Sequence, residues 1–258
     1  MAARKKKTET EAPPKRVIPD HTNLAELLSV KPIFKTATFW IVGDTPLITH
    51  AWSHKAKMAM LQKQVKATTP GREKRDPQAD FVSSLYEMRD GVFGFPVTGV
   101  KNCLLAAAHK DKGIARSAVM ASLFLEAEMV RVMPALAGAI CDLGLVRIWA
   151  GEPEMREDMV KIGSGLNKVA SLAYRAQFTH WAIKIEARFN PEVLTPEALA
   201  FIVQESGLAF GLGEWRNEKK GIFGAFHLAG IKEAREWDNF AQGSGTLPIA
   251  ENFKQAAE

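Results

Sequence analysis

The alternation of apolar and polar residues predicts the strands of a central β-sheet. The clearest is 180–189, HWAIKIEARF, in which Trp181, Ile183 and Ile185 alternate with small or charged residues. One face of this strand is therefore expected in the core and the other in solvent. The run 36–43 is rich in β-branched and aromatic residues and stops at a glycine, which also indicates a strand. Further strand candidates are 123–132, 144–151 and 221–229.

Helical spacing of apolar residues predicts two helices that pack on this sheet. In 98–110 the apolar side chains fall on one face, and Thr98 is the expected N-cap. In 195–206, Thr195 is the expected N-cap before a proline at the first helical position. Gly207 is expected to end this second helix.

Three connections carry signals of their own. Residues 51–67 show helical spacing and then run into the turn-rich basic stretch TTPGREKRDP, which predicts a helix followed by an exposed loop. Asp90-Gly91 lies between two short apolar runs, the signal of a two-residue β-hairpin turn. The run 221–229 alternates imperfectly, which predicts a bulge near Gly224.

The main elements follow the order strand, helix, strand, strand, helix, strand. This order predicts an α+β fold with ferredoxin-like (RRM-like) topology, in which two helices cover one face of the sheet and the other face is open. We expect the domain over residues 32–232, with a basic insertion at about 51–80. Residues 1–20 are expected to form a disordered basic arm, and residues 239–258 a flexible tail.

Positive charge is concentrated in two segments. The 258-residue chain has a net charge of +5, but residues 1–16 alone carry +4 and residues 55–75 carry +6, so the remainder is net negative. Such concentration favours contact with a polyanion, above all nucleic acid, although a lysine-rich terminal arm is also common as a solubilising segment. The predicted phosphate contacts in the insertion are Lys55, Lys57, Lys63, Lys66, Arg72, Lys74 and Arg75.

Composition and spacing argue against several classes of protein. No apolar run approaches the roughly 20 residues that span a bilayer, and the N-terminus lacks the apolar core of a signal peptide, so we expect a cytoplasmic protein without membrane contact. Cys103 and Cys141 stand far apart and predict buried free thiols. His50 and His54 are spaced for one helical face, but no third ligand accompanies them, so neither a metal nor a cofactor is predicted.

The stretch GLGEWRNEKKGIFGAF, residues 211–226, combines glycines with cations and a tryptophan. It is not a dinucleotide fingerprint, because Arg216 stands in the place of the third glycine. Its glycines allow a close backbone approach, so that main-chain N–H groups and cations reach phosphate while the tryptophan stacks on a base. The structural alternative is a helix end with a core tryptophan. The candidate contacts are Gly211, Gly213, Trp215, Arg216, Lys219 and Lys220.

Three stretches resemble the RAMP superfamily, the repeat-associated proteins that form the RNA-binding backbone of CRISPR effectors. VGDTPLITHAWSHKAK is similar to the first strand of that family and the loop after it. GFPVTGVKNCLLAAA is similar to the segment in which a lysine, here Lys101, opens the first helix. GLAFGLGEWRNEKKGIFGAF is similar to the glycine-rich loop before the last strand. Phage and prophage proteins of this type share nearly the same phrases, over most of residues 36–229.

The resemblance implies a ferredoxin-like fold and subunits that stack head to tail along a strand, as a filament. It also implies a phosphate contact by Lys101, since a cation at a helix N-terminus opposes the helix dipole unless an anion lies nearby. The chain departs from the family at Val97-Thr98-Gly99-Val100, which replaces G-S-S-L, and at Gly221-Ile222-Phe223-Gly224, which replaces the last G-x-G. CRISPR membership is therefore not implied.

We accordingly predict a non-catalytic protein, phage-encoded by resemblance, that binds single-stranded nucleic acid and self-associates along it. RNA and DNA both remain open, since no motif reports a 2′-OH contact. A second hypothesis is a metal-independent endoribonuclease, because RAMP endoribonucleases often carry a histidine soon after the first strand, here His50. A third is an assembly or inhibitor protein whose basic arm binds an acidic protein partner.

Overall fold

The structure, a computed structural model, describes residues 34–52, 57, 58, 60, 76–89, 91–108, 115–131, 142–162 and 169–249. The predicted arm over residues 1–20 lies outside the described residues, as do His54, Cys141 and most of the predicted helix 51–67. The same holds for Lys55, Lys63, Lys66, Arg72, Lys74 and Arg75 of the basic insertion.

Antiparallel pairing builds the central sheet around β1 (Lys35–Gly43). This strand pairs along its length with β10 (Trp181–Phe189) and at its end with β11 (Phe226–Leu228). On the far side of β10, β5 (Leu123–Leu125) pairs with its end and β7 (Leu143–Ala150) with its start. The strand order is thus that of a βαββαβ ferredoxin-like sheet, with the last strand next to the first. The predicted fold class is confirmed.

Strand β7 extends the sheet outward. It pairs with β6 (Glu128–Val130) and with β4 (Val92–Pro96), which in turn pairs with β3 (Glu87–Arg89). The β3–β4 hairpin turns at Gly91, which has a φ of +68°, and confirms the predicted turn. The predicted strand 123–132 is divided between β5 and β6, because β5 pairs with β10 and β6 with β7.

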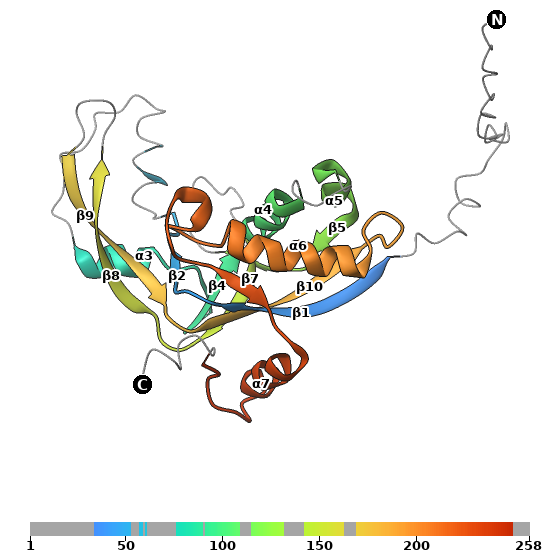
Figure 1. Cartoon of the computed structure of the whole chain (residues 1–258). Coiled ribbons are helices and arrows are strands. Elements are labelled where there is room, and N and C mark those ends of the chain that lie inside the picture. Colours follow the sequence, from blue (N-terminus) through green and yellow to red (C-terminus); the bar gives the residue numbers. More distant parts are fainter. Residues whose placement is uncertain are drawn as a thin grey trace, which may run out of the picture. The chain divides into compact units, whose positions relative to one another are not determined.

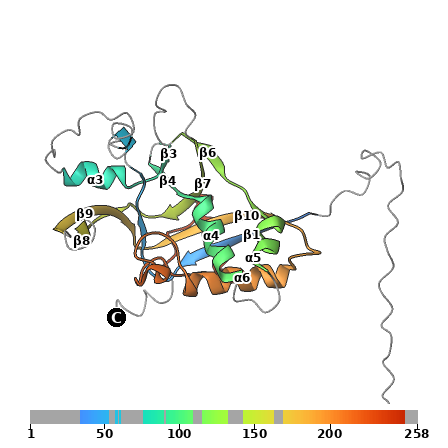
Figure 2. The same cartoon turned by 90° about the horizontal axis from the view of Figure 1, so that it is seen from above.

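Three helices, α4 (Val97–Ala108), α5 (Arg116–Ser122) and α6 (Pro196–Ala209), cover one face of the sheet (Figures 1 and 2). Buried side chains of these helices and of β10 form one hydrophobic cluster, which is the main core. The apolar faces predicted for the two long helices and for the strand at 180–189 therefore meet. In the part of the chain that the structure describes, no helix is long and apolar enough to cross a bilayer.

The ends of the two long helices test the capping predictions. Thr195 accepts a hydrogen bond from a first-turn N–H group, as predicted for the N-cap of α6. The prediction of Thr98 as an N-cap is wrong, because α4 already begins one residue earlier. Gly207 does not end α6, which continues beyond it. A Cβ at Gly207 would overlap the carbonyl oxygen of Phe226, so this glycine allows the helix to approach β11 closely.

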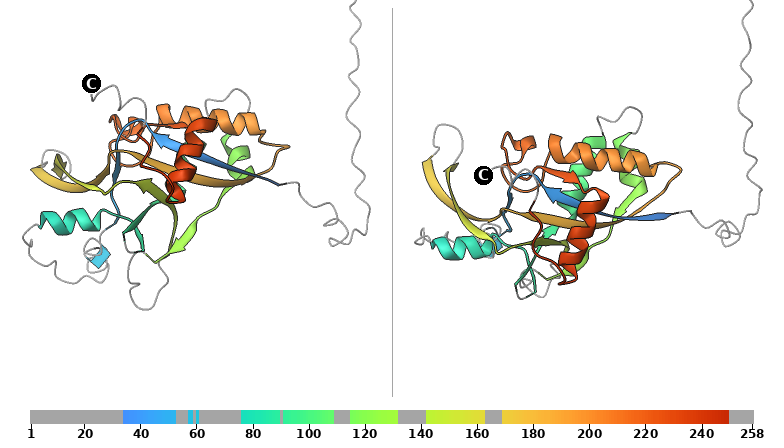
Figure 3. Two further views of the ribbon diagram at one scale, coloured as in Figure 1. Left: turned by 90° about the horizontal axis from the view of Figure 1, so that it is seen from below. Right: turned by 60° about the horizontal axis from the view of Figure 1, so that its bottom comes forward.

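The second face of the sheet is not open, contrary to the prediction. Helix α7 (Ile231–Ala241) lies across it, as Figures 1 and 3 show. Its Trp237 is 1% exposed, and the ring stacks on Trp40 with the centroids 5.9 Å apart. The domain therefore extends past residue 232, where the sequence predicts its end, and the predicted tail 239–258 begins inside a helix.

A second antiparallel sheet, which the sequence did not predict, extends from one end of the first. It consists of β2 (Leu47–Thr49), β9 (Val169–Phe178) and β8 (Glu154–Ile162), and α3 (Pro77–Ser83) packs on β9 (Figure 2). The sequence has glycines at positions 163 and 165, a signal that could have indicated a hairpin here. This sheet stands beside the glycine-rich segment and contributes to the candidate site.

His227 ties α7 to the end of the central sheet. Its Nδ1 lies 2.8 Å from an Asp44 carboxylate oxygen and its Nε2 lies 2.9 Å from a Glu233 carboxylate oxygen. Both ring nitrogens can donate only when the imidazole is protonated. The hydrogen bonds to Asp44 and to Glu233 raise the pKa of His227 from 6.5 to about 10. A charged imidazole thus links the end of β1 to α7 at neutral pH.

We expect His227→Gln to destabilise the protein most at mildly acidic pH. Because the pKa of His227 is higher in the folded state, its contribution is complete below about 6.5 and is lost as the pH rises through about 10. Urea unfolding of both proteins between about pH 6 and pH 10 should give a difference in unfolding free energy that shrinks with rising pH. A difference that is constant over this range would contradict the charged link.

Candidate nucleic-acid interface

Residues 210–225, called the glycine loop below, connect α6 to β11 and are fixed to residues 46–48, at the start of β2. The Gly224 N–H donates to the Pro46 carbonyl at 2.9 Å, and the Glu214 N–H donates to the Ile48 carbonyl at 3.0 Å. Across the loop, the Leu212 N–H donates to the Gly224 carbonyl at 2.8 Å. The loop is therefore held by backbone hydrogen bonds at both of its ends.

The glycines of the loop permit these close approaches. Gly213 and Gly224 have φ values of +76° and +67°, and a Cβ on them would overlap the carbonyl oxygens of Ile48 and Leu212, respectively. Gly211, with φ +72°, leaves room for the Gly224 carbonyl. Packing within the chain thus explains Gly211 and Gly213, two of the predicted contacts, without a ligand.

The last strand of the sheet is shorter than predicted, because the glycine loop takes up its expected first half. The sequence predicts a strand over 221–229 with a bulge near Gly224, but β11 begins only at Phe226. Gly224 has a left-handed backbone conformation. Its N–H donates to the Pro46 carbonyl and its carbonyl accepts from the Leu212 N–H, so neither group takes part in strand pairing. Only an isolated bridge between Arg216 and Phe223 remains of the extended pairing.

Trp215 is an exposed aromatic residue on a constrained backbone. Its φ is +54°, a left-handed conformation that bulky residues seldom adopt, and 39% of the residue is exposed. Its carbonyl accepts the Phe223 N–H at 3.1 Å, and Gly221 packs so closely that a Cβ there would overlap this carbonyl oxygen. The indole is therefore presented to solvent by a rigid turn, and the alternative of a core tryptophan is excluded.

The cations of the loop divide into two kinds. The Arg216 guanidinium donates to the Gly213 carbonyl at 2.9 Å and to a Glu218 carboxylate oxygen at 2.6 and 2.9 Å, and it is half-buried. Arg216 therefore holds the turn around Trp215 rather than standing free in solvent. Lys219 and Lys220 follow it on the loop and are both exposed.

Helix α4 contacts the glycine loop through Cys103. The thiol donates to the Gly211 carbonyl at 3.3 Å and lies 3.5 Å from the Ser206 carbonyl, and burial raises its pKa to about 12. The prediction of a buried free thiol is confirmed for this cysteine. Lys101 is half-buried in the second turn of the same helix and not at its N-terminus. The three stretches that resemble the RAMP family, separate in sequence, thus meet at one end of the sheet.

The basic insertion leaves and re-enters the domain beside the loop. The Ala51 N–H donates to the Ser84 carbonyl at 2.9 Å, so the chain before the insertion and the chain after α3 lie side by side. Trp52, next to this junction, is 56% exposed. Lys57 is the one predicted cation of the insertion within the described residues, where it is half-buried.

His50, the predicted catalytic alternative, lies at the same place. Its Nδ1 is 3.6 Å from a Glu214 carboxylate oxygen, and the Tyr86 hydroxyl donates to its carbonyl at 3.3 Å. The hydrogen bond with His50 lowers the pKa of Glu214. No group of side chains suited to a metal ion occurs among the described residues. Sequence reasoning missed Glu214, whose place opposite His50 follows from the backbone contact with β2.

The β8–β9 hairpin packs against the far side of the loop. The Arg156 guanidinium lies 4.4 Å from the centroid of the Phe223 ring and donates to Asp158 and Gln177. Neither Arg156 nor this hairpin was among the residues predicted for the site. The hairpin thus supports the loop from the side opposite α4.

No family model and no curated protein matches this chain. Among solved structures it is similar to a chain in the cryo-EM structure of the type III-B Cmr-beta bound to cognate target RNA, with 9% sequence identity and a TM-score of 0.44. The alignment covers 80% of this chain and 62% of that chain, so this chain spans about three fifths of the length of that neighbour.

Arg216→Ala should lower the melting temperature measurably, whereas Lys220→Ala should leave it nearly unchanged. The arginine makes three hydrogen bonds inside the loop, each contributing on the order of 0.5–1.5 kcal/mol, while Lys220 is exposed. Thermal unfolding followed by circular dichroism measures both variants. Equal melting temperatures for wild type and Arg216→Ala would show that the loop does not depend on this side chain.

Proposed function

We propose that this protein binds single-stranded nucleic acid, without cleaving it, at the glycine loop. The observation that carries the proposal is Trp215, an exposed indole on a left-handed, hydrogen-bonded turn. A solvent-exposed tryptophan held this rigidly loses little conformational freedom when a base stacks on it. Stacking needs an unpaired base, so the expected ligand is a single strand and not a duplex.

The charges around this indole suit a phosphate backbone. Lys219 and Lys220 follow Trp215 on the same loop and are exposed. The basic insertion joins the domain next to His50. Lysines bind phosphate as mobile point charges and need no fixed geometry. In this proposal the insertion and Lys101 extend the path of the strand, and Arg216 positions Trp215.

The proposal includes self-association along the strand, which the RAMP resemblance implies. It names RNA first and DNA as the competing ligand, because stacking and lysine–phosphate contacts serve both. Titration of matched RNA and DNA oligonucleotides, followed by analytical ultracentrifugation at increasing strand length, separates these choices. Binding of one protein per strand at every length would remove the self-association part.

Trp215→Ala should weaken binding of a single-stranded oligonucleotide by about 1–3 kcal/mol, with the melting temperature nearly unchanged, because the stacking surface is removed from an exposed position. Fluorescence anisotropy with a labelled RNA 20-mer measures the affinity. Phe201→Ala is the matched control, since this aromatic residue is also exposed but lies on α6, and it should bind as wild type does.

The same titration carries a second check. With on the order of 5 lysine or arginine contacts to phosphate, a fourfold rise in salt should weaken binding by about two orders of magnitude. Affinity that is independent of salt, or identical for wild type and Trp215→Ala, would refute the proposal. Binding only to duplex would do so too.

A second function is supported by the contact between His50 and Glu214. An exposed imidazole beside a carboxylate can accept a proton from a 2′-hydroxyl, which is the first step of metal-independent RNA cleavage. Its carboxylate partner would orient the ring and stabilise the protonated form. This site adjoins Trp215, so one bound strand could reach both.

The two functions differ in the fate of the RNA and in the effect of His50→Ala. For the binding protein, this variant should leave RNA affinity within a few fold of wild type, and the RNA should stay intact in EDTA after prolonged incubation. Gel analysis of a labelled RNA, with an all-2′-deoxy strand as control, makes the measurement. Cleavage of RNA alone by wild type and not by His50→Ala would establish the endoribonuclease in place of the non-catalytic binder.

A further inference from the structure

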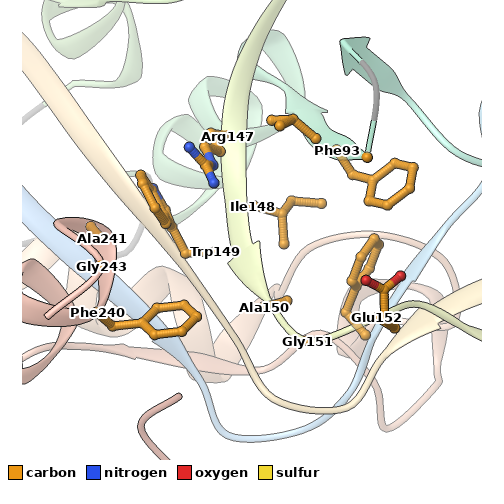
Figure 4. A pocket seen from close by; sticks show the side chains of 13 residues that line it. Phe93, Arg147, Ile148, Trp149, Ala150, Gly151, Glu152, Phe240, Ala241 and Gly243 are labelled. Atoms are coloured by element: carbon orange, nitrogen blue, oxygen red, sulfur yellow. The ribbon is translucent and has the colours of Figure 1, made fainter. Parts of the chain in front are cut away.

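A cavity of about 480 Å³ lies at the end of β7, and no residue of the glycine loop lines it. Its walls come from the β3–β4 turn, from β7 and from the end of α7. Figure 4 shows Arg147 and Trp149 on one side of β7, with Phe240 of α7 below them, and Ile148 on the opposite side with Phe93. A volume of this size falls within the range of small-molecule sites.

Arg147 contributes a positive charge to the lining of this cavity. Its guanidinium carbon lies 3.6 Å from the centroid of the Trp149 ring, and its Nε is buried without a hydrogen-bond partner. Among the described residues no carboxylate forms an ion pair with it. Burial lowers the pKa of Arg147, and the positive charge of Arg89 lowers it further. A half-buried guanidinium that lines an open cavity favours binding of an anion there.

Aromatic side chains supply a flat wall next to this cation. The Trp149 ring makes edge contacts with Trp40, at 6.1 Å between centroids, and with Phe240, at 6.5 Å, which fix its orientation. Figure 4 shows Glu152 on the side of β7 that carries Ile148 and Phe93, away from Arg147. An anionic group is therefore favoured at the Arg147 end of the cavity.

We propose that this cavity binds a nucleotide, with its phosphate at Arg147 and its base against Phe240. Phosphate carries more negative charge than a carboxylate and accepts two hydrogen bonds from one guanidinium group. The nucleotide is either a free mononucleotide or an unpaired nucleotide of a longer strand, and the chemistry of recognition is the same. This inference does not rest on the function proposed for the glycine loop.

Isothermal titration of the full-length protein with AMP, GMP, CMP and UMP tests the proposal. At least one should bind saturably, and the matching nucleoside and inorganic phosphate should each bind at least about tenfold more weakly. Arg147→Gln should weaken binding by about tenfold or more, because a hydrogen-bonded charge pair is lost. Arg188→Gln is the control: its guanidinium also stacks on an aromatic ring, Phe124, but pairs with Glu126 outside the cavity.

Arg147→Lys keeps the test valid if Arg147→Gln fails to fold, since it retains a positive charge beside Trp149. It should also weaken binding, because an ammonium group cannot make the bidentate contact with phosphate. The proposal is overturned if no mononucleotide binds at millimolar concentration, or if neither variant changes the affinity. Competition with an RNA oligonucleotide identifies the source. Displacement of the mononucleotide assigns the cavity to a nucleotide of the strand, and simultaneous binding assigns it to a free nucleotide. Trp215→Ala should leave mononucleotide binding unchanged, which separates this site from the glycine loop.

Discussion

The close approach of two backbones, the glycine loop and residues 46–48 at the start of β2, is the constraint on which the candidate interface depends. The Gly224 N–H and the Glu214 N–H donate to the Pro46 and Ile48 carbonyls, and Gly213 leaves space for the Ile48 carbonyl. These backbone hydrogen bonds hold the loop in place. Because the loop is fixed, the left-handed turn at Trp215 is maintained although its indole is exposed.

Helix α7 moves the available surface away from the face of the sheet. The Lys184 ammonium and the Trp40 indole N–H both bond one oxygen of Asp238, at 2.7 and 3.1 Å, next to the stack of Trp40 on Trp237. A strand could not lie across this part of the sheet without removing the helix. Among the described residues, the glycine loop and the cavity beside α7 are thus the candidate surfaces that this helix leaves accessible.

The sequence was sufficient to predict the elements that form the core, but not the contacts between elements. Periodicity placed β1, β10, α4 and α6 correctly, because their buried faces are set by local alternation of apolar residues. It missed α7, whose apolar face is little more than Trp237 and Phe240. It also missed the β8–β9 hairpin, in which β8 carries charges on both faces.

The candidate site shows the same division. Trp215, Lys219 and Lys220 were found because residue type alone suggested stacking and phosphate binding, and exposure is consistent with that choice. Arg216 was expected to be free, since sequence does not show that Glu218 and the Gly213 carbonyl fold back onto its guanidinium. His50 and Glu214 could not be paired from sequence, because the contact depends on the loop meeting β2.

The hydrogen-bond partners of the arginines distinguish those that stabilise the fold from those available to a ligand. Arg216 and Arg156 donate to carboxylates and carbonyls of their own neighbourhood, so their charge is neutralised where they stand. Arg147 stacks on an aromatic ring as Arg156 does, yet its buried Nε has no acceptor. A buried donor without an acceptor costs on the order of 1–3 kcal/mol. Arg175 also has buried nitrogens without a hydrogen bond, but its guanidinium lies 3.5 Å from an Asp158 carboxylate oxygen. Among the described residues no carboxylate pairs with Arg147, so its charge is available to an anion in the cavity beside α7, away from the loop that the sequence singled out.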